Sequence, residues 1–164
     1  MILVGTAGFR YPDWKGPFYP ERMRDSELLQ YYARRFPVVE LDFTYYRMPT
    51  VRAMASLSAR TPDGFEFCVK AHKTMTHETP ASPEETASIF REFREAVRPL
   101  VDDGKLGCVL AQFPHSFKPS QRSRDYVIMF RDSCEGLPVV VEYRNNLWVG
   151  AETEGFLKRE GLGF

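Results

Sequence analysis

The chain has 164 residues, and its 22 basic and 22 acidic side chains cancel to no net formal charge. This balance gives no general attraction to nucleic acid or to an anionic membrane surface, so any binding to nucleic acid would have to be local. The longest apolar runs are far shorter than the ~20 residues of a membrane helix, and the three scattered cysteines lack zinc-site spacing. We therefore expect a cytoplasmic protein with reduced thiols and no membrane span.

The first third of the chain predicts two strands separated by a loop and a helix. A strand at 2–5 leads into a loop at 6–20 that is rich in glycine, proline and aromatic residues, as ordered functional loops often are. A helix is expected to start at Asp25 or Ser26, because either residue can cap it and apolar residues follow at helical spacing. In the stretch 38–47, a short β-branched run that starts at Val38 ends abruptly in acids, aromatics and an arginine, which indicates a buried strand with chemistry at its end.

The rest of the chain continues the alternation. Further strands are expected near residues 66, 106 and 138, with the start of a sixth near 162. A polar loop is expected at 72–80, and Ser82 followed by Pro83 and Glu85 predicts a capped helix start. Other helices are expected to start at Pro49 or Thr50 and to cover about 124–132 and 152–159.

Strict alternation of strands and helices predicts a parallel sheet covered by helices. A doubly wound sheet and a (β/α)₈ barrel both fit this pattern. The barrel is favoured because every strand is followed by polar residues, whereas a doubly wound sheet concentrates them at one switch point. A complete barrel typically needs about 250 residues, and this chain has five repeating units.

Five motifs at the strand ends recur in one order over the whole chain: Gly5–Gly8 with 11–14 and 18–20, then 39–47, then 67–71 with Thr76 and His77, then 110–114 with 116–117, and finally 141–144 with Trp148. Together they resemble the YecE-like proteins, domain-of-unknown-function family 72. The resemblance implies a TIM-barrel-like fold of eight strands and no established activity. Relative to the family pattern, Ala7, Asp42, Tyr45 and His115 are mild departures, and the missing carboxy-terminal part is a serious one. We expect residues 1–164 to form a single, partial TIM-barrel-like domain from a truncated or incompletely assembled gene.

Period-two alternation places a polar group from each of four strands at the mouth of the predicted barrel. These groups are Glu40, Lys70, Gln112 and Glu142. Glu40 and Glu142 are the predicted acid and base, and Lys70 is an electrostatic stabiliser or a Schiff-base nucleophile. The structural alternative is a buried ion-pair network. We favour a site, because four polar groups from four strand ends need many satisfied bonds to be merely structural.

Other residues that follow the strands are candidates for binding a substrate. Arg47 and Arg144 could clamp a phosphate or carboxylate, or could pair with nearby acids. His77 is the favoured histidine because it lies in a family-like motif. Tyr11, Trp14 and Trp148 could stack on a ligand ring, although aromatic residues that close the barrel top are the commoner explanation.

This residue set is consistent with an enzyme, a hydrolase or a lyase/isomerase, that acts on a small polar or anionic substrate. The alternative is a non-catalytic module that binds a nucleotide, a sugar phosphate or a nucleic-acid strand. No metal ligand set is assigned, because the histidines lack metal-site spacing. The sequence identifies neither a cofactor nor an oligomeric state.

Overall fold

The computed structural model describes residues 2–164 as a five-stranded parallel sheet with seven α-helices. The strands are β1 (Gly5–Ala7), β2 (Val38–Leu41), β3 (Glu66–Lys70), β4 (Leu106–Phe113) and β5 (Val139–Tyr143). The helices are α1 (Leu28–Ala33), α2 (Phe43–Tyr46), α3 (Val51–Ser58), α4 (Lys73–Thr76), α5 (Pro83–Asp102), α6 (Gln121–Ser133) and α7 (Ala151–Arg159).

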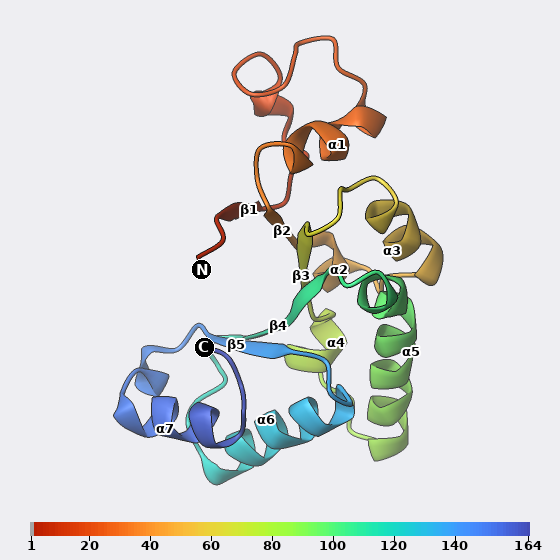
Figure 1. Cartoon of the computed structure of the whole chain (residues 1–164). Helices are drawn as coiled ribbons and strands as arrows, with labels where there is room; N and C mark the ends of the chain where they lie inside the picture. Colours follow the sequence, from red (N-terminus) through yellow and green to blue (C-terminus); the bar gives the residue numbers. More distant parts are fainter. Residues whose placement is uncertain (1) are drawn as a thin grey trace.

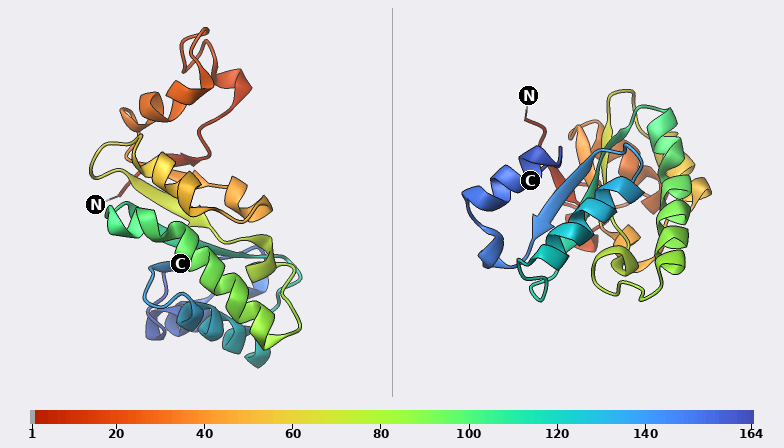
Figure 2. Two further views of the ribbon diagram at one scale, coloured as in Figure 1. Left: turned by 90° about the vertical axis from the view of Figure 1, so that its right-hand side faces the viewer. Right: turned by 90° about the horizontal axis from the view of Figure 1, so that it is seen from below.

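The strands lie in the sheet in the order in which they follow one another in the chain, from β1 to β5. Right-handed crossovers between successive neighbours place the connecting helices on the same side of the sheet. Figures 1 and 2 show the larger helices along one side of the curved sheet, with both chain ends on the other. The order has no reversal, so these five strands lack the switch point of a doubly wound sheet. The sheet is open, and β1 and β5 are its two edges.

The two faces of the sheet differ in burial. Side chains that face the helices are almost completely buried, and those of Val39, Phe67, Val69, Val109 and Ala111 are 0% exposed. The alternate residues on the opposite face, such as Glu40, Cys68 and Lys70, are only partly buried. The main core therefore lies between the sheet and its helices. The opposite face, here called the open face, carries the predicted site residues Glu40 and Lys70.

Helix starts follow the capping residues. The Thr50 side chain accepts a hydrogen bond from the Ala53 amide at 3.2 Å, and that of Ser82 accepts one from the Glu85 amide at 3.3 Å. Both groups satisfy amides that lack a partner within the first turn of a helix. These two predicted helix starts are confirmed.

Several predicted boundaries are wrong. The first strand was predicted at 2–5 but is β1, at Gly5–Ala7. It starts at Gly5 because its partner strand β2 begins only after Pro37, where Val38 pairs with Gly5. The second strand starts at Val38 as predicted and ends at Leu41. There the Thr44 hydroxyl lies 2.6 Å from the carbonyl oxygens of both Leu41 and Lys70, and α2 begins.

Two further expectations need correction. The polar stretch at 72–80 contains α4, capped by the His72 side chain. In place of a sixth strand, an isolated bridge joins Gly163 to Val140.

Among residues 2–164, no helix combines the length and the apolar character that crossing a membrane requires.

Candidate functional site

An ion pair links the ends of the neighbouring strands β2 and β3. The Lys70 ammonium donates to Asp42 Oδ1 at 3.3 Å, and the Lys70 side chain is 13% exposed. Lys70 ends β3, and Asp42 follows β2 in the first turn before α2. An ammonium with so little access to water benefits strongly from a carboxylate partner. The pair therefore places a positive charge where the two strands end.

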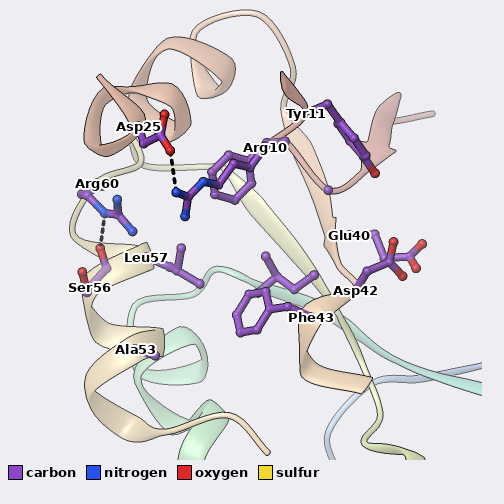
Figure 3. Close-up of a pocket in the computed structure, with 13 residues that line it drawn as sticks. Arg10, Tyr11, Asp25, Glu40, Asp42, Phe43, Ala53, Ser56, Leu57 and Arg60 are labelled. Carbon is purple, nitrogen blue, oxygen red and sulfur yellow. Dashed lines mark hydrogen bonds and ion pairs between the residues drawn. The ribbon is translucent and has the colours of Figure 1, made fainter. Parts of the chain in front are cut away.

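Glu40 lies on the open face next to this pair. Burial, a hydrogen bond to Asp42 and the negative charge of Asp42 raise the pKa of Glu40 from 4.5 to about 7, against the opposing effect of the Lys70 charge. The negative charge of Glu142 adds a smaller increase. Figure 3 shows the carboxyl groups of Glu40 and Asp42 side by side. A carboxyl group with a pKa near 7 can both accept and donate a proton at neutral pH.

A cavity of about 550 Å³ opens beside these acids, between β1, β2 and α3. Its wall includes Glu40 and Asp42 on one side and Arg10 and Arg60 on the other, with Phe43 between them (Figure 3). Arg10 pairs with Asp25, and Arg60 Nε donates to the Ser56 carbonyl at 2.9 Å. The cavity is large enough for a small molecule and has mainly apolar walls. Glu40 and Asp42 lie at one edge of it, with their carboxyl groups directed away from Phe43 and Leu57 (Figure 3).

The polar row extends from Lys70 toward His77. The Lys70 ammonium lies 5.4 Å from the Tyr45 ring centroid. The Tyr45 and His77 rings meet edge-on, with their centroids 4.9 Å apart. Burial and the charges of Lys70 and Arg144 lower the pKa of His77. His77 is therefore neutral at physiological pH, with its Nδ1 at 2.9 Å from the Thr76 hydroxyl.

Glu142 and Gln112 lie farther along the open face. They are register partners on β5 and β4, and Gln112 is 8% exposed. Glu142 accepts a hydrogen bond from Arg144 Nε at 2.8 Å, so Arg144 pairs with an acid, as one of the two alternatives for it predicts. The other arginine, Arg47, is exposed and forms no ion pair within residues 2–164.

The aromatic candidates differ in their surroundings. The Tyr11 hydroxyl donates to the Ala7 carbonyl, and the Tyr11 ring lies 4.9 Å from that of Trp14. Tyr11 is 40% exposed and contributes to the cavity wall. Trp14 packs against the rings of Phe18 and Tyr19, which places it in the aromatic cluster of the first loop.

Trp148 is a packing residue. Its indole is 1% exposed, stacks on Tyr143 at 4.1 Å between centroids, and donates from Nε1 to the Phe117 carbonyl at 2.7 Å. No ring face remains for a ligand, so the structure does not support the predicted stacking role of Trp148.

Sequence reasoning missed Arg10 and Arg60, which lie at the far end of the cavity. Arg10 belongs to the glycine- and aromatic-rich loop that was expected to be functional, so its position held a signal. Arg60 follows α3 in an ordinary polar stretch, and nothing in the sequence around it indicated a site. Between residues 2 and 164, no three side chains of the His, Cys, Asp or Glu types converge as a metal site would require.

The chain is similar to proteins from several bacteria. The model of the family described as "Protein of unknown function DUF72" matches residues 3–164. The UPF0759 protein YunF of Bacillus subtilis is 30% identical over 98% of this chain and 58% of its own length. The UPF0759 protein YecE of Escherichia coli K12 is 29% identical over 83% of this chain and 45% of its own.

Solved structures give the same result. A DUF72 family protein of Thermotoga maritima is 37% identical, with a TM-score of 0.84 over 99% of this chain and 63% of that one. One from Enterococcus faecalis is 27% identical, with a TM-score of 0.81 over 98% of this chain and 58% of that one. This chain therefore spans about three fifths or less of the proteins it matches. With its match over residues 3–164, the chain belongs to the DUF72 family.

Proposed function

We propose that this protein is part of a barrel enzyme that acts on a small polar or anionic substrate by carboxylate acid/base chemistry. The observation that carries the proposal is Glu40, a carboxyl group with a pKa of about 7 beside the Lys70–Asp42 ion pair and the 550 Å³ cavity. Perturbed pKa values in a cavity are typical of catalytic groups. The chemistry proposed is hydrolysis or a lyase/isomerase reaction.

The proposal includes closure of the sheet in a longer chain. The consecutive strand order, the helices on one side and the polar groups at the strand ends are features of a (β/α)₈ barrel. On this proposal, residues 2–164 are one partial domain that supplies five of the eight strands, and the open face is the barrel interior. The acids then lie where barrel enzymes bind their substrates.

The roles of the residues follow from their surroundings. Glu40 transfers the proton, because its pKa lets it exchange one at neutral pH. Lys70 stabilises negative charge that develops on the substrate, and Asp42 orients the ammonium group. Arg10 and Arg60 attract an anionic group at the other end of the cavity. Glu142, held by Arg144, serves as the second carboxylate.

Turnover of chromogenic nitrophenyl esters, glycosides and phosphates tests the hydrolytic form of the proposal, first with the full chain and then with a relative of complete length. We expect turnover that depends on a group with a pKa near 7 and falls about 10²- to 10⁴-fold in Glu40→Gln. Glu66→Gln is the matched control, because it removes a carboxylate from the same face at the opposite end of β3. Equal losses in both variants would refute the assignment.

The rival proposal is a binding module without turnover. Binding of the same compounds by calorimetry separates the two proposals. An enzyme retains ligand binding in Glu40→Gln while turnover falls. A binding module shows no turnover in the unmodified protein, and Glu40→Gln changes its affinity alone.

A further inference from the structure

Two cysteines lie side by side on the open face, next to the proposed catalytic acid. Cys68 on β3 and Cys108 on β4 are direct register partners, and their sulfur atoms are 3.3 Å apart. Both side chains are partly buried. The third cysteine, Cys134, is 0% exposed in the main core, and burial raises its pKa to about 12. The chain thus holds one close thiol pair and one isolated, buried thiol.

A shift in strand register creates the pair. Phe67 is opposite Leu106, whereas Cys68 is opposite Cys108, so β4 carries one extra residue, Gly107, at this point. Such a bulge turns the following side chains relative to the neighbouring strand. The Glu66 carboxylate packs closely over this glycine: a Cβ atom at Gly107 would lie 2.8 Å from it, so a larger residue would displace the Glu66 side chain. The bulge places both thiols on the same face of the sheet, directly opposite each other on neighbouring strands.

The two thiols are chemically unequal. With both thiols protonated, the Cys108 thiol donates a hydrogen bond to the Cys68 sulfur at 3.3 Å. When Cys108 ionises, the Cys68 thiol can donate to it instead. This interaction, together with burial, raises the pKa of Cys68, and the same interaction lowers the pKa of Cys108. The negative charge of Glu40 acts in the other direction on Cys108, with a smaller effect than the hydrogen bond. Cys108 is therefore the better nucleophile and Cys68 the thiol held next to it.

One thiol of the pair borders a hollow on the open face. This hollow, of about 220 Å³, is lined by Cys68 and Glu40, together with residues of β1 and β2. Cys108 does not line it, but its sulfur is 3.3 Å from that of Cys68 and its side chain is partly exposed. A peroxide molecule is far smaller than this hollow. Cys134, behind the sheet, has no such access.

We propose that Cys68 and Cys108 are a redox-active dithiol that hydrogen peroxide converts into a cross-strand disulfide. The Cys108 thiolate attacks one peroxide oxygen and the O–O bond breaks, which gives the sulfenic acid and, with one proton, a first water. The Cys68 sulfur then attacks the Cys108 sulfur, the S–O bond breaks, and the hydroxide leaves as a second water with the Cys68 proton. Two thiols are oxidised by two electrons, and one peroxide is reduced to two waters.

The strand geometry permits this bond. Neighbouring strands are about 4.8 Å apart, which lies within the ~4.4–6.8 Å range of Cα separations in disulfides. Small rotations of the two side chains close the remaining distance between the sulfur atoms. A thiol reductant can reverse the reaction, because the same hollow gives access to the disulfide.

The test uses the full chain treated with hydrogen peroxide, followed by alkylation and mass spectrometry. We expect an intact mass lower by two hydrogen atoms, a linked peptide pair containing Cys68 and Cys108, and full reversal by dithiothreitol. Cys134→Ser should behave like the unmodified protein. Cys68→Ser should accumulate a Cys108 sulfenic acid that dimedone traps, whereas Cys108→Ser should leave Cys68 reduced.

Other outcomes would overturn the proposal. These are an intermolecular disulfide, faster oxidation of Cys134 than of the pair, dimedone labelling of Cys68 in Cys108→Ser, or both thiols remaining free after peroxide has oxidised the methionines. The mapping on the unmodified chain needs no variant, so a folding defect in a serine variant cannot obscure the result. The disulfide does not depend on the proposed catalytic role of Glu40, and either can fail alone.

Discussion

The Lys70 ammonium donates to Asp42 Oδ1 at 3.3 Å and thereby joins the ends of β2 and β3. These two residues act on Glu40 in opposite directions. The positive charge of Lys70 lowers the pKa of Glu40, whereas the carboxylate of Asp42 raises it. The protonation of Glu40 near neutral pH is thus a balance between two neighbours that also bind each other.

This balance predicts opposite effects of two substitutions. Lys70→Met is expected to raise the pKa of Glu40 above 7, because the opposing positive charge is lost. Asp42→Asn is expected to lower it, because the largest effect after burial disappears. Titration of the Glu40 carboxyl carbon by NMR measures both values. Shifts in the same direction in the two variants would contradict the arrangement.

The pKa of Glu40 also predicts how stability depends on pH. Its pKa in the folded protein, about 7, is above its ordinary value of 4.5. Between pH 4.5 and 7 the unfolded chain loses the Glu40 proton more readily, so the free energy of unfolding falls as pH rises. Glu40→Gln removes this loss and should gain about 1–2 kcal/mol relative to the unmodified protein across that window, a value reduced for partial exposure.

Urea unfolding at several pH values measures this difference. Glu66→Gln controls for the loss of one negative charge from the same face of the sheet. A stability difference between the Glu40 variant and the unmodified protein that stays constant from pH 4.5 to 7 would show that Glu40 titrates normally.

What could be predicted from sequence depends on the range of the interactions. The helix start at Ser82 follows from residues three positions apart, and the shared face of Glu40 and Lys70 follows from strand periodicity. The partner of Lys70 could not be predicted, because it depends on the turn of the chain after Leu41. The pairing of Cys68 with Cys108 depends on the bulge at Gly107, which appears only when two strands are aligned.

Lys105 offers a stability prediction away from the site. This lysine is 6% exposed, and its ammonium donates to the carbonyl oxygens of Ser58 and Thr61, each at 2.8 Å. These are carbonyls at and beyond the end of α3, which need partners outside the helix. Lys105→Met should lower the free energy of unfolding by about 1–3 kcal/mol, because buried acceptors lose their donor. Lys118→Met, at an exposed position, should change it by less than about 0.5 kcal/mol.

A substitution at Trp148 tests whether this aromatic candidate serves packing, as the structure indicates, rather than ligand binding. Its indole stacks on Tyr143 and donates to the Phe117 carbonyl at 2.7 Å, so Trp148→Phe loses both a hydrogen bond and ring area in a buried site. We expect a loss of about 1–3 kcal/mol in the free energy of unfolding. Urea unfolding monitored by circular dichroism measures this loss. Trp14→Phe is the matched control, because Trp14 is only partly buried, and it should cost less than about 1 kcal/mol. A Trp148 variant of unchanged stability would show that the β5–α7 region does not depend on this ring for its packing.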